Sequence, residues 1–275
     1  MTGRIIVLAH AHDAGAAAVA AALARRAGRA IVDVVRPEAL GVARWSHHVD
    51  PGGHVTTRLT LPRAASPIER VDCVLNRLQY LPTPRFHRAS LKNRDFAAAE
   101  LSALVMSWLG SLGRRVVNPV ASHGMSATAS WSRRWLPAAA ACGLRVPRSV
   151  VATASRLLAP VGPGERVRRS AAWPYPVDGR APAEVVPDET QMIAAGMVLV
   201  AGVQVVGALA PRVGAGCAAL ARTTGYPLLE LRFAEILGAL TLVSVETLPA
   251  LDTPAAVAAA TDLIETVAAG GGIPA

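Results

Sequence analysis

Apolar runs separated by a helical segment open the chain. Residues 4–8, 31–35 and 71–76 are short, mostly apolar runs of the kind that forms buried strands. Between the first two, residues 14–27 form an alanine-rich segment with helical periodicity. Because a crossover helix separates two apolar strands, we expect these strands to run parallel in one sheet. The opening of the chain is therefore predicted as α/β.

The later pattern predicts antiparallel pairing. A hairpin is expected over 197–209, and two more strands are expected at 228–233 and 240–245. Residues 154–191 are rich in Pro, Gly and Arg without periodicity, which predicts a linker or surface segment. Helices are expected at 95–112, 131–142, 213–224 and 253–268, and an early hairpin at 45–61. The predicted fold class is α/β, with one domain over 1–120 and a smaller α+β domain, including the irregular segment 154–191, over 121–275.

One stretch without charged residues raises the question of a membrane span. Ile193–Ala210 carries no charged side chain and is near the length of a transmembrane helix. Its β-branched runs and its glycines favour the buried hairpin instead. We therefore expect no membrane partner.

Composition and charge narrow the function classes. The chain has 275 residues, 52% of them hydrophobic, and a formal net charge of +9 that comes almost entirely from arginine. The arginines are scattered, with no run long enough to follow a phosphate backbone, so nucleic acid is not an expected partner. The three cysteines form no Cys-x-x-Cys pair, and residues 5–8 are too short for a signal-peptide core. These features predict a cytoplasmic protein with reduced thiols.

Several local strings resemble the RimK-like branch of the ATP-grasp superfamily, whose members use ATP to join an amine to a carboxylate. The strings are Leu8-Ala9-His10-Ala11-His12-Asp13, Val74-Leu75-Asn76-Arg77-Leu78-Gln79-Tyr80-Leu81-Pro82, Val117-Asn118-Pro119 and Gly143-Leu144-Arg145-Val146-Pro147. Together they cover about the first 150 residues. The resemblance implies a pre-ATP-grasp Rossmann-like N-terminal domain followed by a reduced ATP-grasp-like α+β domain.

The later chain departs from what this resemblance implies. The family holds the nucleotide phosphates with lysines of a small antiparallel subdomain, whereas Lys92 is the only lysine here. The family binds its magnesium ions through an acidic residue before Leu-Arg and through a Glu-x-Asn-Pro string. Glu230, Arg232 and Glu246 match it as degenerate cofactor-binding residues, but Leu248 stands at the asparagine position. We therefore expect no bound cofactor, with Mg-ATP as the cofactor if the chain is active.

Two further groups of side chains are candidate sites. His10, His12 and Asp13 follow the first strand and could bind a metal, although Asp13 could equally cap the next helix. A cationic rim near the end of the strand at 71–76 could bind a carboxylate or phosphate, although solvated surface cations are the plainer interpretation. This candidate anion site consists of Asn76, Arg77, Tyr80, Arg85, Arg88 and Lys92.

Three functional hypotheses follow. The first is a non-ligating protein of a peptide or small-molecule biosynthetic pathway that binds an anionic small molecule, a peptide or a catalytic partner protein. The second is an active ATP-dependent carboxylate-amine ligase in which Glu230 and Glu246 hold metal and arginines from 166 to 180 replace the lysines. The third is a repurposed enzyme that uses the His/Asp site in the vacated cleft. A homo-oligomer is compatible with all three.

Overall fold

The computed structural model describes residues 4–27, 32–62, 64, 66–121, 125, 131–152, 161–169 and 183–270. Its first layer is a four-stranded parallel sheet of order β2-β1-β5-β6. These strands are β1 (Arg4–Leu8), β2 (Val32–Val35), β5 (Val71–Asn76) and β6 (Val116–Val117). The predicted parallel pairing is confirmed. β1 and β5 are almost entirely buried, which explains why both are apolar runs rather than alternating strands.

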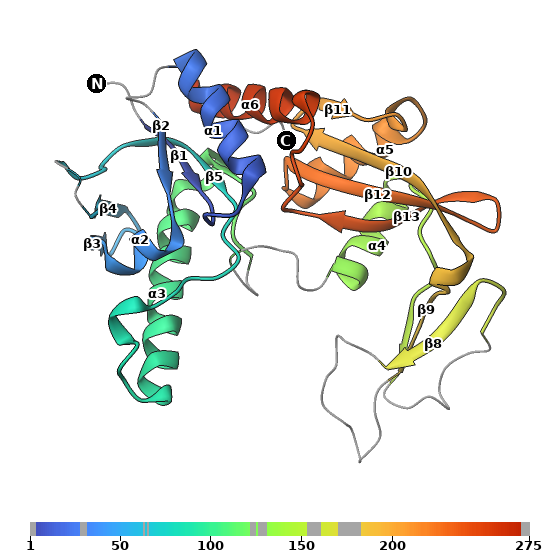
Figure 1. The fold of residues 1–275 in the computed structure, drawn as a ribbon, viewed down its shortest axis with the longest axis horizontal. Helices are drawn as coiled ribbons and strands as arrows, with labels where there is room; N and C mark the ends of the chain where they lie inside the picture. The colour runs from blue at the N-terminus through green and yellow to red at the C-terminus, as the bar shows by residue number, and fades with distance from the viewer. Residues whose placement is uncertain are drawn as a thin grey trace.

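Helices and a hairpin cover this sheet (Figure 1). The hairpin predicted over 45–61 is confirmed by the antiparallel pair β3 and β4. The helix predicted from Asp95 begins at Leu91 instead, because Ser90 Oγ accepts a hydrogen bond from Asn93 N and caps the helix. The elements are α1 (Ala14–Ala27), α2 (Pro37–Val42), β3 (Arg44–Val49), β4 (Val55–Thr60), η1 (Pro84–Phe86), α3 (Leu91–Leu112) and η2 (Gly113–Arg115).

The second part of the chain is built on an antiparallel sheet of order β11-β10-β12-β13. Ile193–Ala210 lies largely in its first hairpin, which turns at Gly202, so the hairpin interpretation of this charge-free stretch is confirmed. The elements are α4 (Trp131–Ala141), η5 (Glu189–Gln191), β10 (Met192–Ala201), β11 (Gln204–Val206), α5 (Ala210–Thr224), β12 (Leu228–Ile236), β13 (Ala239–Glu246) and α6 (Pro254–Ala268). By length and composition alone, one stretch among the described helices, Leu91–Arg115, could cross a membrane.

A third, smaller sheet corrects the prediction for residues 154–191. β7 (Val150–Ala152), β9 (Ala183–Pro187) and β8 (Glu165–Arg169) form an antiparallel sheet with β9 in the centre. The prediction of an irregular segment is wrong for the described residues of this span. The pattern was hidden because β8 carries three arginines on an edge strand and β9 buries Glu184 beside its apolar residues.

The C-terminal helix joins the two larger sheets. α6 packs against α1, and one apolar cluster contains Val7 of β1, Leu199 of β10, Leu228 of β12 and Ile264 of α6. Figure 1 shows α6 lying beside α1 above the junction of the two sheets. The division at residue 120 stays a prediction, since the first sheet draws part of its cover from the far end of the chain.

Candidate functional site

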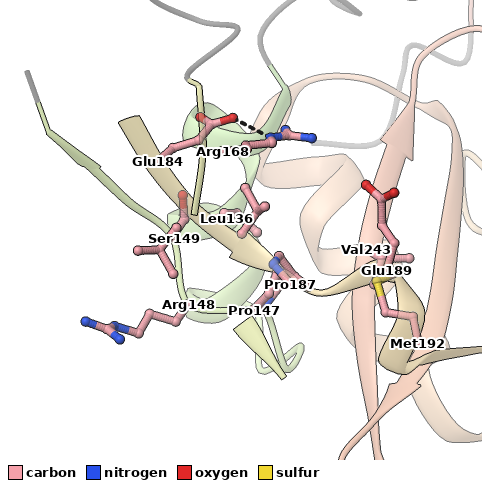
Figure 2. Close-up of a pocket in the computed structure, with 12 residues that line it drawn as sticks. Leu136, Pro147, Arg148, Ser149, Arg168, Glu184, Pro187, Glu189, Met192 and Val243 are labelled. Atoms are coloured by element: carbon pink, nitrogen blue, oxygen red, sulfur yellow. Dashed lines mark hydrogen bonds and ion pairs between the residues drawn. The ribbon is translucent and has the colours of Figure 1, made fainter. Parts of the chain in front are cut away.

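A cavity of about 130 Å³ lies between the small sheet and the second large sheet (Figure 2). Pro187 ends β9 before the segment that leads to β10, and Pro147 lies between α4 and β7. Met192 and Val243 line the cavity from the large sheet. Arg168 of β8 contributes the cationic side of the wall. The cavity therefore lies where the chain passes from one antiparallel sheet to the other.

The arginines around this cavity are already ion-paired. Arg168 Nε donates to Glu184 Oε1 at 2.8 Å, and the Glu184 side chain is only 7% exposed. Arg148 Nη1 donates to Glu165 Oε2 at 3.0 Å. An arginine bound to a carboxylate has much of its charge compensated, so an anion that approaches it meets a weaker field. Both arginines that line the cavity are in this state.

Glu230 of β12 and Glu246 of β13 are the two carboxylates that the resemblance assigns to magnesium binding. They lie opposite each other on the paired strands. Glu230 is buried, and its Oε1 accepts a hydrogen bond from Arg232 Nε at 2.7 Å and forms an ion pair with Arg232 Nη2, also at 2.7 Å. Its Oε2 accepts from Ala250 N at 3.0 Å. Glu246 Oε1 accepts from Ser244 Oγ at 2.8 Å. At least three of the four carboxylate oxygens are therefore engaged by protein donors.

These residues do not fit the magnesium ions that hold a triphosphate. A magnesium ion needs nearly octahedral oxygen coordination, and Leu248 offers only hydrocarbon at the position of the family's asparagine. Glu230 also lines a separate hollow of about 220 Å³ beside α6, and it is not among the residues that line the cavity next to Arg168. The structure therefore brings Glu230, Arg232 and Glu246 together but leaves them bonded to protein groups.

The loop after β1 is held by an ion pair with the end of β5. Arg77 donates through Nε to Asp13 Oδ2 at 2.6 Å and through Nη2 to Asp13 Oδ1 at 3.2 Å. Asp13 Oδ1 also accepts from Ala16 N at 2.9 Å, so the interpretation of Asp13 as the cap of α1 is confirmed. Both Asp13 oxygens are committed to these bonds.

His10 is packed beside this ion pair. Its ring stacks with His12 at 5.7 Å between centroids and lies 4.4 Å from the ring of Tyr80. Gln79 N donates to His10 Nε2 at 3.3 Å, which requires an unprotonated nitrogen there. Burial, followed by the charge of His12, lowers the pKa of His10 below its usual value. No group of three or more His, Cys, Asp or Glu side chains in the described residues could hold a metal ion, so the metal hypothesis gains no support.

The six residues of the candidate anion site differ in exposure, since two are buried and four, including Tyr80, are exposed. Asn76 and Arg77 are buried, and Asn76 Nδ2 donates to Asn118 O and Met125 O, both at 3.0 Å. The three cations are instead exposed: Arg85 lies on η1, Arg88 between η1 and α3, and Lys92 at the start of α3. Asn76 and Arg77 thus serve the fold, whereas Arg85, Arg88 and Lys92 face solvent.

Two features were not found from the sequence. Asn118 ties the two large sheets together, and Glu184 neutralises Arg168. The Asn118-Pro119 string was noticed only through the family resemblance, and the only local signal for Glu184 was an acid beside two valines. Both roles depend on partners far away in the sequence.

The fold defines the class of protein. No protein-family model and no curated protein matches the chain. Solved structures do match over nearly the whole chain, and they include ATP-grasp ligases and a macrocyclase. The resemblance to the ATP-grasp superfamily is therefore confirmed at the level of the fold.

Three of these structures show the range of the likeness. A Chryseobacterium gregarium RiPP-associated ATP-grasp ligase in complex with ADP and a leader and core peptide has a TM-score of 0.65 at 12% identity, over 96% of each chain. The macrocyclase MdnC from Microcystis aeruginosa, bound with precursor peptide MdnA, has a TM-score of 0.68 at 12% identity, over 96% of this chain and 100% of MdnC. A RimK domain ATP-grasp protein from Sphaerobacter thermophilus has a TM-score of 0.51 at 16% identity, over 97% of this chain and 98% of its own.

Proposed function

We propose that this chain is a non-ligating ATP-grasp-fold protein that binds a peptide in a biosynthetic pathway, alone or with a catalytic partner protein. The similar structures include ligases and a macrocyclase that hold precursor peptides, which supports a peptide as the bound molecule. The same likeness supports a biosynthetic role. We further propose that the protein works in the cytoplasm.

The observation that carries the non-ligating part is that the charged side chains at the cavity beside Arg168 and at the hollow beside α6 are already bonded to protein groups. A triphosphate is held by cationic groups and metal ions that offset its negative charge. Here Arg148 and Arg168 are neutralised by Glu165 and Glu184, and Glu230 is bonded to Arg232 and Ala250 N. A nucleotide bound in the cavity beside Arg168 would compete with the arginine ion pairs, and magnesium ions at Glu230 would compete with its bonds to Arg232 and Ala250 N. Each competition weakens binding by the free energy of the bonds that must break.

An active carboxylate-amine ligase is the second candidate. One observation favours it, because the sheet β7-β9-β8 stands where the family's small antiparallel subdomain is expected, and Arg168 lies on it beside the cavity. In this alternative the arginine replaces a lysine and Mg-ATP is the cofactor. The similar structures that contain ADP or magnesium keep this alternative open.

Calorimetry with Mg-ATP separates the two candidates. We expect no micromolar binding by the wild-type chain and no ADP formation with a carboxylate and an amine present. Micromolar binding that disappears in Glu246→Ala would overturn the proposal in favour of the active ligase.

A second variant tests the physical reason. Glu184→Gln keeps the size and shape of the side chain but removes the charge that neutralises Arg168. We expect this variant to bind triphosphate more tightly than the wild type does. Glu69→Gln, which removes the exposed partner of Arg58 far from the cavity, is the matched control and should bind as the wild type does.

A further inference from the structure

Three large apolar side chains are exposed within a short stretch of chain, where η1 meets the start of α3. Phe86, Leu91 and Phe96 are 44%, 66% and 67% exposed, within eleven residues of chain. Soluble proteins seldom leave large apolar side chains uncovered in one neighbourhood unless something binds there. We call this neighbourhood the η1–α3 surface, which consists of Arg85, Phe86, Arg88, Leu91, Lys92, Arg94 and Phe96.

The tertiary structure covers little of this part of α3. The buried residues of the helix are Val105, Trp108 and Leu109, all in its C-terminal half. Figure 1 shows the N-terminal half of α3 projecting beyond the sheet, with the η1 segment beside it. The start of α3, with Leu91 and Phe96 among polar residues, is thus left open to a partner.

The same surface is positively charged. It carries Arg85, Arg88, Lys92 and Arg94 against one acid, Asp95, between residues 84 and 96. Within the described part of the chain, no ion pair joins any of these four cations to a carboxylate. Arg85 Nη2 donates to the backbone oxygen of Val42 at 2.7 Å, which leaves its charge uncompensated. This surface therefore differs from the cavity beside Arg168, where Arg148 and Arg168 are ion-paired.

We propose that the η1–α3 surface docks an acidic peptide segment that carries large apolar side chains. Carboxylates of the segment would pair with the free cations, and its apolar side chains would cover Phe86, Leu91 and Phe96. The inference rests on the proposed peptide-binding role and names the surface that performs it. It assigns docking to a face that is separate from the cavity beside Arg168.

Two other occupants fit the surface less well. A second copy of the chain would bring the same four cations against themselves, and like charges across an interface oppose association. A membrane surface is nearly flat on this scale, whereas Leu91 and Phe96, five positions apart, point roughly 140° apart around the helix. A peptide segment can follow the curved helix and reach both side chains.

Fluorescence anisotropy with synthetic peptides tests the proposal. The probe is a labelled peptide that alternates Glu with Leu and Phe. One matched peptide has Lys in place of Glu, and another has Ser in place of Leu and Phe. We expect the acidic apolar peptide to bind and both matched peptides to bind at least about tenfold more weakly, since both charge and apolar contact are required.

Protein variants locate the binding. Arg88→Glu/Lys92→Glu and Phe96→Ser should each weaken binding of the acidic apolar peptide, the first by at least about tenfold. Arg212→Glu/Arg222→Glu, on exposed positions of α5, changes the net charge equally and should leave binding unchanged.

Several results would overturn the proposal. They are equal binding of the acidic and basic peptides, equal weakening by the α5 control, and cosedimentation with phosphatidylserine vesicles in the absence of peptide binding. A concentration-dependent dimer that Phe96→Ser dissociates would also overturn it, in favour of a second copy. Failure of the non-ligating proposal would instead appear as Mg-ATP binding. The Arg88→Glu/Lys92→Glu variant should not alter that binding.

Discussion

Asn118 provides the most quantitative test of how the two large sheets are joined. Its side chain is buried and donates through Nδ2 to Leu228 O at 2.7 Å and to Thr247 O at 2.6 Å. Its Oδ1 accepts from Leu228 N at 3.1 Å. Its backbone has a φ of 62°, a conformation that asparagine tolerates better than most residues. One side chain thus connects the end of the parallel sheet to the start of β12 and to the residue that follows β13.

We predict that Asn118→Gly destabilises the protein by about 3 kcal/mol, since three buried hydrogen bonds at about 1 kcal/mol each are lost. Asn118→Ala should cost a further ~1–2 kcal/mol, because a Cβ is strained at this φ. The total approaches the whole stability of a marginal domain, which is about 5 kcal/mol.

Urea unfolding measures these differences. Tryptophan fluorescence reports on both halves of the chain, through Trp108 in the first core and Trp135 in the second. Asn93→Ala, at an exposed asparagine of α3, is the control and should change stability by less than about 0.5 kcal/mol. A loss below about 1 kcal/mol in Asn118→Ala, or equal effects of Ala and Gly, would refute the reasoning.

Three further predictions concern buried polar groups. Arg77→Ala should destabilise the protein by about 3–5 kcal/mol in thermal or urea unfolding, because it leaves its carboxylate partner without a counter-charge; a loss of less than about 1 kcal/mol would contradict this role. The pKa of His10 is lowered below its ordinary 6.5, so the folded state favours the neutral ring. The stability that this preference adds is complete above pH 6.5 and is lost as pH falls below 6.5. Melting temperatures between neutral and acidic pH should therefore fall more steeply for the wild type than for His10→Gln, and parallel curves would count against this. Burial raises the pKa of Cys73 and Cys217 to about 12, so iodoacetamide should label Cys142 first in the native protein, as peptide mass spectrometry can measure.

Local pattern alone was enough for much of the fold. The sequence predicted β1, α1 and β5 within a residue of their observed bounds, because an apolar run or helical periodicity is contained within each segment. The resemblance to ATP-grasp proteins rests on short strings near the ends of β1, β5 and β6 and after α4, and solved structures of ATP-grasp ligases share the fold. Glu230 and Glu246 were singled out through that resemblance, and the structure places them opposite each other on the paired strands β12 and β13.

The state of the candidate site required the tertiary structure. Asn118 bonds to Thr247, 129 positions away, and α6 completes a core that begins at β1. β8 and β9 gain their stability by pairing with each other and with β7, so neither shows a strong pattern of its own. Whether Arg168 is free to hold an anion depends on Glu184 across the strand pair. A sequence supplies the charges, but only the packed chain decides which of them are compensated by one another and which still face solvent.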